Sequence, residues 1–243
     1  MKVLAIGNSF SQDATRYLHQ IALADGYDLK VVNLDIGGCS LERHHDNITY
    51  DRQDYSLEVN GHATGRYVSI REALLSDTWD FVTLQQVSHL SFDYSTYQPY
   101  LAVLSDYVRK YAPTARQLIH QTWAYEEGSE KLAGVGYRSQ KDMFEDLKRA
   151  YDKAAQSIGA RLIPCGEAMQ RLSECGIGKV HRDGFHAGLG LARYMLGAVW
   201  YECLTGRSIE NNSFRELDEY ASGEELAIAK RCAHEAVMKY SGS

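Results

Sequence analysis

The chain has 243 residues, of which 44% are hydrophobic and 24% charged, and a formal net charge of −6 at pH 7. These values are ordinary for a globular protein with a sizeable core, so we expect a single domain over residues 1–243. The acidic balance argues against nucleic acid or an anionic membrane as a partner. No apolar stretch approaches the ~20 residues that a membrane-spanning helix needs.

The cysteines favour a reducing compartment. There are five of them and no Cys-x-x-Cys pair: Cys39, Cys165, Cys175, Cys203 and Cys232. An odd number without paired spacing is typical of reduced thiols, so we expect a cytoplasmic protein without a disulfide framework. The apolar run that opens the chain, 2–6, is too short for a signal peptide. Nothing in the sequence defines an oligomeric state.

Short β-favouring apolar runs alternate with stretches of helical periodicity along the whole chain. The expected strands are 2–6, 29–34, 81–84, 117–121 and 161–164. The expected helices are 15–24, 97–111, 140–158, 189–204 and 223–240. This alternation predicts an α/β fold, namely a flavodoxin-like three-layer α/β/α sandwich around a parallel sheet of about five strands. Functional residues then gather just after the carboxyl ends of the strands.

One segment, 42–66, interrupts the alternation. It is polar, rich in His, Asp, Asn and Tyr, and too long for an ordinary connection. We expect a polar loop excursion over the strand ends, with a small hairpin around 55–67. Such a loop either shapes a substrate pocket or decorates the surface.

The first strand leads into Gly7-Asn8-Ser9-Phe10-Ser11, where the first helix should begin. A serine at a helix N-terminus lies among free backbone N–H groups and the positive end of the helix dipole, which favour developing negative charge. Serine and asparagine are also common helix N-caps. Ser9 is therefore a candidate nucleophile, with a capping residue as the alternative.

A second block, Asp183-Gly184-Phe185-His186, lies near the other end of the chain. An aspartate three residues before a histidine can direct its carboxylate at one imidazole nitrogen and leave the other as an acceptor. That arrangement fixes the tautomer and stabilises the imidazolium, as a general base requires. Surface loops supply Asp-x-x-His by chance, so the block gains weight only together with Ser9.

Together the two blocks resemble those of the SGNH (GDSL-like) hydrolases, with Asn8 in place of that family's aspartate and Phe10 in place of its leucine. The resemblance implies a catalytic triad of Ser9 as nucleophile, Asp183 as orienting acid and His186 as general base. It also implies an oxyanion hole that includes the N–H groups of Ser9 and of a glycine after the second strand. Gly38 is the best match for that glycine and Gly37 is the fallback, although a turn with positive φ also favours glycine there.

The third strand is followed by Leu84-Gln85-Gln86, whereas the SGNH family usually has Gly-x-Asn. A glutamine amide supplies the same kind of N–H donor with a longer reach. The resemblance therefore points to Gln85, and next to Gln86, as the last oxyanion donor. Losing one such donor typically costs ~10²–10³ in rate.

Three further residues are candidates for substrate contact. Trp123 follows the fourth strand and is a candidate wall for sugar stacking, with core packing as the alternative. His44 and His45 are candidates if the segment 42–66 folds over the site. Adjacent histidines on a polar segment are more often exposed than metal-bound, so we expect no metal.

The resemblance implies a serine esterase, without a cofactor, that hydrolyses small-molecule or carbohydrate esters, such as acetyl groups on carbohydrate, through an acyl-enzyme. Two alternatives stay open. The missing asparagine favours a non-catalytic protein that binds a small ligand or carbohydrate on the same fold. A flavodoxin-like nucleotide or flavin module is the other, and the glycine-poor loop after the first strand argues against it.

Overall fold

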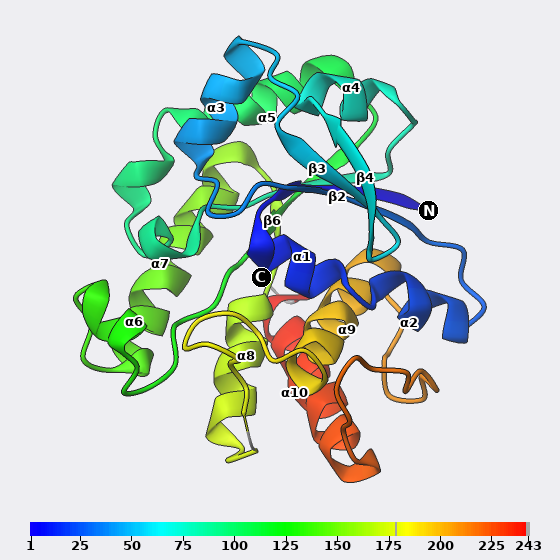
Figure 1. Cartoon of the computed structure of the whole chain (residues 1–243), viewed down its shortest axis with the longest axis vertical. Helices are drawn as coiled ribbons and strands as arrows, with labels where there is room; N and C mark the ends of the chain where they lie inside the picture. The colour runs from blue at the N-terminus through cyan, green and yellow to red at the C-terminus, as the bar shows by residue number, and fades with distance from the viewer. Residues whose placement is uncertain (178, 242–243) are drawn as a thin grey trace.

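The computed structural model describes residues 1–177 and 179–241. Its strands are β1 (Lys2–Gly7), β2 (Lys30–Asp35), β3 (Tyr55–Val59), β4 (His62–Val68), β5 (Phe81–Leu84), β6 (Arg116–His120) and β7 (Arg161–Ile163). They form one seven-stranded sheet in the order β4-β3-β2-β1-β5-β6-β7 (Figure 1). Strands β2, β1, β5, β6 and β7 are parallel, which confirms the predicted sheet. β3 and β4 extend it as an antiparallel hairpin.

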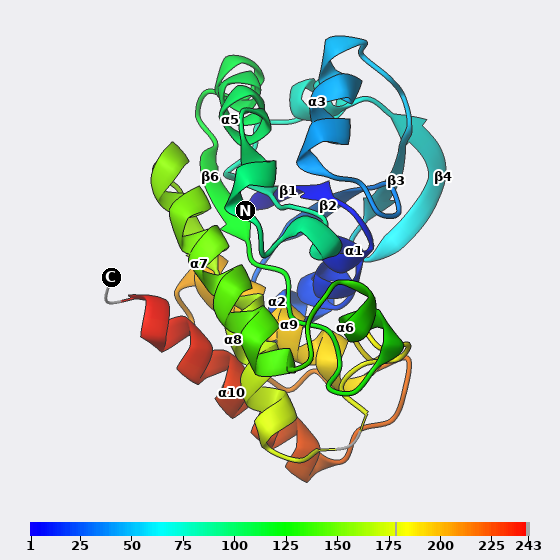
Figure 2. The same ribbon diagram turned by 90° about the vertical axis from the view of Figure 1, so that its left-hand side faces the viewer.

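Helices cover both faces of this sheet, as Figures 1 and 2 show. One layer contains α3 (Leu41–Thr49), α4 (Ile70–Leu75), α5 (Tyr100–Tyr111) and α7 (Gln140–Ile158). The other contains α1 (Ser9–Thr15), α2 (Leu18–Ala24), α8 (Cys165–Glu174), α9 (Leu191–Thr205) and α10 (Gly223–Ser241). Short helices η1 (Ser88–Leu90), η2 (Tyr94–Tyr97) and α6 (Glu130–Gly134) lie in the connections. The three-layer α/β/α sandwich is therefore confirmed.

The segment 42–66 is not the loop excursion that its polarity suggested, because it contains most of α3 and both strands of the hairpin. The hairpin expected around 55–67 is confirmed, and it joins the sheet by pairing β3 with β2. A polar strand fits there because the Asn33 amide donates to the buried Glu58 carboxylate at 2.8 Å. Helix α3 begins after Ser40, whose hydroxyl accepts from the N–H of Arg43.

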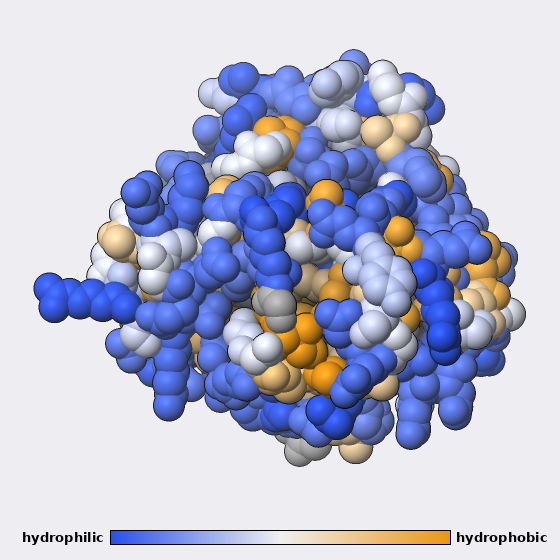
Figure 3. All heavy atoms as spheres, turned by 60° about the horizontal axis from the view of Figure 1, so that its bottom comes forward, coloured by the Kyte–Doolittle hydropathy of each residue, from blue (hydrophilic) through white to orange (hydrophobic). Residues whose placement is uncertain are grey.

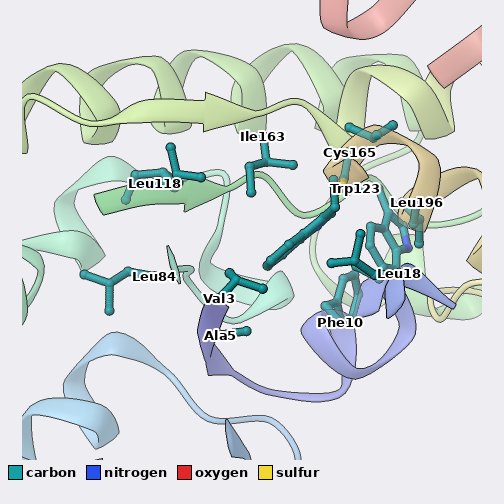
Figure 4. Close-up of a cluster of buried hydrophobic side chains, with 14 of the residues drawn as sticks. Val3, Ala5, Phe10, Leu18, Leu84, Leu118, Trp123, Ile163, Cys165 and Leu196 are labelled. Atoms are coloured by element: carbon teal, nitrogen blue, oxygen red, sulfur yellow. The ribbon is translucent and has the colours of Figure 1, made fainter. Parts of the chain in front are cut away.

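The core contains buried apolar residues of the sheet and of both helix layers. In the part that Figure 4 shows, Phe10, Leu18, Trp123 and Leu196 lie close together. Phe10 is 2% exposed and Trp123 is 0% exposed, and their ring centroids are 4.3 Å apart. This pair packs α1 against the chain that follows β6. Large buried side chains thus hold the start of α1, and this fixes the position of Ser9.

The outer surface is mostly polar. The face that Figure 3 displays is predominantly hydrophilic, with a small apolar group near its centre and another toward its right side. Scattered apolar side chains of this kind are normal on a folded surface. Within 1–177 and 179–241, no helix is both long and apolar enough to cross a membrane.

Candidate active site

Ser9 is the first residue of α1, and one residue, Asn8, separates it from the end of β1. The preceding residue, Asn8, has extended backbone angles and caps the helix, since its Oδ1 accepts from the Phe10 N–H at 3.0 Å. The capping role that was the alternative for Ser9 therefore belongs to Asn8. The Ser9 hydroxyl is left available for a different partner.

That partner is His186. Ser9 Oγ lies 2.8 Å from His186 Nε2, although the two residues are 177 positions apart. On the other side of the ring, His186 Nδ1 lies 2.8 Å from Asp183 Oδ2, and the His186 N–H donates to Asp183 Oδ1 at 2.9 Å. Because the carboxylate can only accept, the neutral ring carries its proton on Nδ1, and Nε2 accepts from the hydroxyl. This geometry permits His186 to remove a proton from Ser9.

The charge state of Asp183 suits this arrangement. Partial burial raises the pKa of its carboxyl group, but the hydrogen bonds from the His186 side chain and backbone lower it more. The net shift is downward, so Asp183 is ionised at neutral pH. An ionised carboxylate is what orients the imidazole and stabilises the imidazolium.

The loop that carries Asp183 and His186 is held from the inside. Gly184, at φ +87, allows the tight turn, and its carbonyl accepts from the Glu126 N–H at 2.8 Å. The Trp123 indole N–H donates to the Phe185 carbonyl at 2.8 Å. Since Trp123 is 0% exposed, it supports this loop from within the core and offers no face to a sugar. Its predicted role in sugar stacking is therefore wrong.

Gly38 lies in an exposed turn after β2. Its φ of +65 explains the glycine, and the Cys39 N–H closes the turn on the Ile36 carbonyl at 3.1 Å. The Asn8 amide donates to the Cys39 carbonyl at 3.0 Å. The turn that carries Gly38 is thus tied to the residue next to Ser9, and its proposed oxyanion role stays a prediction.

The two glutamines are engaged within the protein. The Gln85 amide donates to Asn8 Oδ1 at 2.7 Å, and its Oε1 is 2.7 Å from His120 Nδ1. The Gln86 amide nitrogen donates to both the carbonyl and the hydroxyl of Thr96, at 3.0 and 3.1 Å. Gln86 therefore joins β5 to η2 and has no N–H to direct at Ser9. Gln85 has a second amide hydrogen, but the Gln85 side chain is only 2% exposed and is hydrogen-bonded to Asn8.

A series of hydrogen bonds follows from this, and the motifs in the sequence did not reveal it. Burial lowers the pKa of His120 to about 3, so the neutral ring donates through Nδ1 to Gln85. Gln85 donates to Asn8, and Asn8 donates to the Cys39 carbonyl. The series crosses the ends of β6, β5, β1 and β2. Gly7 makes room for it, since a Cβ there would lie 2.9 Å from the Gln85 amide carbon.

His44 and His45 do not form a pair at the site. His44 is 0% exposed, its Nδ1 is 2.7 Å from the Tyr55 hydroxyl, and burial lowers its pKa to about 3. This places His44 in the core under α3, so its predicted contact with substrate is wrong. His45 packs against Tyr100 at 5.5 Å between ring centroids. Among the described residues no three His, Cys, Asp or Glu side chains cluster as metal ligands.

A surface hollow of about 1100 Å³ lies away from Ser9. Met1, Arg116 and Arg161 line it, and these residues lie at the amino ends of the strands. Ligands of open α/β sheets bind at the carboxyl ends of the strands. We therefore place the candidate site at the Ser9–His186 contact and not at this hollow.

The fold is similar to that of SGNH hydrolases. A protein from Slackia heliotrinireducens assigned to the SGNH hydrolases is 24% identical, with a TM-score of 0.60 over 84% of this chain and 98% of that one. An acetylxylan esterase from Geobacillus stearothermophilus is 14% identical, with a TM-score of 0.53 over 84% of this chain and 94% of that one. At these identities the likeness shows the fold alone.

The chain belongs to the DUF4886 family, a domain of unknown function whose model matches residues 2–236. A DUF4886 family protein from Bacteroides uniformis ATCC 8492 is 35% identical to it. The TM-score of that pair is 0.91, over 98% of this chain and 95% of that one. No curated protein sequence matches the chain.

Asp35 pairs with Gly7 in the sheet, close to the site, and its environment disfavours the ionised carboxylate. Burial, together with the charges of Glu58 and Asp13, raises the pKa of its carboxyl group to about 6. Its Oδ1 is buried and has no hydrogen-bond partner in the described structure. Ionised Asp35 therefore destabilises the fold at neutral pH.

We expect Asp35→Asn to stabilise the protein at pH 8 by on the order of 1 kcal/mol and to change little at pH 4. Between pH 4 and 6 the folded state holds a proton that the unfolded state has released. Wild-type stability therefore falls as pH rises through this range, and the deficit persists above it. Urea unfolding at both pH values measures the difference. The exposed Asp28→Asn is the control, and an equal effect of Asp35→Asn at the two pH values contradicts this account.

Proposed function

We propose that the protein is a serine esterase in which Ser9 is the nucleophile, His186 the general base and Asp183 its orienting acid. The observation that carries the proposal is the unbroken hydrogen-bonded series from Asp183 through His186 to Ser9, with 2.8 Å at each step. Side chains from two distant parts of the sequence meet here in the order that acyl transfer requires. The likeness of the fold to SGNH hydrolases and acetylxylan esterases supports the same class of reaction.

The proposed reaction has two steps. His186 Nε2 takes the Ser9 proton while Ser9 Oγ attacks the ester carbonyl, and His186 then protonates the leaving alcohol. A water molecule then gives a proton to His186 as it attacks the acyl-serine. His186 returns that proton to Ser9 Oγ, which leaves as the hydroxyl and frees the acid. Asp183 stays ionised throughout and stabilises the imidazolium in both steps.

The proposed oxyanion hole uses backbone donors. One donor is the N–H of Ser9, the first residue of α1. The other is the N–H of Gly38, whose turn is held by the hydrogen bond from the Asn8 amide to the Cys39 carbonyl. Preorganised donors stabilise the tetrahedral intermediate because they need not reorient during the reaction. Gln85 contributes by holding Asn8, so its role in this proposal is to support the hole.

The proposed substrates are small-molecule or carbohydrate esters with short acyl groups, most concretely acetyl esters of carbohydrate. One structural neighbour of this chain is an acetylxylan esterase. The turn at Gly37 and Gly38 is exposed, so an ester on a larger molecule can approach Ser9 from the solvent side. No metal or organic cofactor has a part in the proposed steps.

We expect wild-type protein to hydrolyse p-nitrophenyl acetate faster than the butyrate and octanoate esters. Ser9→Ala should lower kcat by a factor on the order of 10⁴–10⁶, because it removes the attacking oxygen. The control is Ser11→Ala, two residues along the same helix, where a buried hydroxyl bonds Asn33 Oδ1 at 2.7 Å. That variant should lose only about 1 kcal/mol of stability and keep its activity.

Activity that survives in Ser9→Ala contradicts the mechanism. A folded wild type that hydrolyses none of these esters, nor acetylated xylo-oligosaccharides, supports the alternative of a protein that binds such ligands without turning them over.

We expect Asp183→Asn to lower kcat by roughly 10²–10⁴ while the fold remains intact. The amide has the shape of the carboxylate, but it favours the wrong imidazole tautomer and does not stabilise the imidazolium. Steady-state kinetics of wild type and variant measure the loss, with thermal unfolding as the check on folding. A loss of less than about tenfold shows that Asp183 does not orient the base.

A further inference from the structure

Asp13 is a fully buried carboxylate, at 0% exposure, that has no part in the proposed reaction. It lies in α1 four residues after Ser9, which is about one helical turn. Arg182 Nη1 lies 2.9 Å from both of its oxygens, and Arg193 Nε donates to Oδ1 at 2.8 Å. Two cations from distant parts of the chain thus converge on one anion inside the protein.

The same carboxylate also bonds the backbone beside the candidate base. The N–H of Ala187, the residue after His186, donates to Asp13 Oδ2 at 3.2 Å. The Ala187 carbonyl accepts from Arg182 Nη1. The His186 carbonyl accepts from the Arg182 backbone N–H at 3.0 Å. Asp13 and its partner Arg182 therefore fix the backbone at His186 and at the residue that follows it.

We propose that Asp13 is a positioning residue that sets the distance between His186 and Ser9. The inference rests on the proposed function, since it concerns the transfer of a proton between those two side chains. Helix α1 carries the nucleophile at its first residue and the anchor of the base-bearing loop one turn later. Because the helical turn between Ser9 and Asp13 is rigid, the hydrogen bond from Ala187 to Asp13 fixes the position of the His186 imidazole relative to Ser9.

The distance between Ser9 Oγ and His186 Nε2 must be kept within narrow limits. Proton transfer requires Ser9 Oγ and His186 Nε2 within about 3.2 Å, and the structure has them at 2.8 Å. A displacement of about 1 Å can cost on the order of 10² in rate even when it starts away from the reacting atoms. Asp183 orients the ring within its own loop. Asp13 differs because it places that loop relative to the nucleophile.

The chain provides a matched control in Asp218. This carboxylate pairs with Arg16 of α1 at 2.6 Å, and it shares Arg193 with Asp13 through a contact of 3.4 Å. These partners lie outside the loop 181–187. Asp218→Asn therefore removes an acid from the same group of charges without touching the backbone beside His186.

The test compares Asp13→Asn, Asp218→Asn and wild type in three measurements. These are p-nitrophenyl acetate kinetics, the rate and final extent of fluorophosphonate labelling, and amide hydrogen exchange of the segment 181–190. We expect Asp13→Asn to lower kcat roughly 10–10²-fold with less than about a threefold change in KM. Labelling should slow by the same factor and still reach one adduct per molecule. Exchange in 181–190 should be faster in Asp13→Asn, while Asp218→Asn matches wild type in all three measurements.

The rate and extent of labelling separate positioning from folding. A purely structural role lowers the labelled fraction and leaves the folded molecules reacting at the wild-type rate, and that result overturns the proposal. If Asp13→Asn does not fold, Arg182→Gln replaces it. This variant keeps the contacts of Asp13 with Arg193 and Ala187 but frees the Ala187 carbonyl, so a rate loss of about tenfold is expected.

Two failures are distinguishable. An active wild type whose Asp13→Asn variant, or its replacement Arg182→Gln, has unchanged kcat or unchanged exchange in 181–190 overturns the positioning role alone. A folded wild type that neither turns over ester nor labels overturns the proposed function and the positioning role with it.

Discussion

The hydrogen bond between Ser9 and His186 depends on two parts of the chain that are 177 positions apart. It forms because β1 lies inside the parallel sheet, between β2 and β5, so the residues after β1 meet the loops of both neighbours. The base arrives from the segment before α9, which packs on the same side as α1. The hydrogen bonds around the site hold either Ser9 or the loop that carries Asp183 and His186.

Two groups of buried polar side chains perform these tasks. Near Gly38, the side-chain amides of the residues that follow β5 and β1, Gln85 and Asn8, connect His120 to the turn after β2. On the side of His186, the Asp13 carboxylate gathers two arginines and a backbone N–H. Buried polar groups are costly unless they are paired, so each group specifies one arrangement of its members. The departures from the usual SGNH blocks at Asn8 and Gln85 belong together, because each amide satisfies the other.

Local patterns in the sequence predicted the α/β fold, the parallel strands and the hairpin, because strand runs and turn spacing depend on neighbouring residues. They also singled out Ser9, Asp183 and His186, which the structure brings into contact. The exposure of a side chain is a tertiary property, and for this reason Trp123 and His44 were misassigned to the substrate. Asp13 gave no signal, since its arginine partners lie 169 and 180 positions away. Helix α3 was missed because its mostly polar residues hide the periodicity of a short helix.

The most direct test of the central claim is intact-protein mass spectrometry after treatment with a fluorophosphonate, followed by peptide mapping of the adduct. Such reagents react with a serine hydroxyl only when a neighbouring base activates it. We expect a single adduct, on Ser9, that is absent when the protein is unfolded before treatment. An adduct on any other serine, or a folded protein that takes up no reagent, contradicts it.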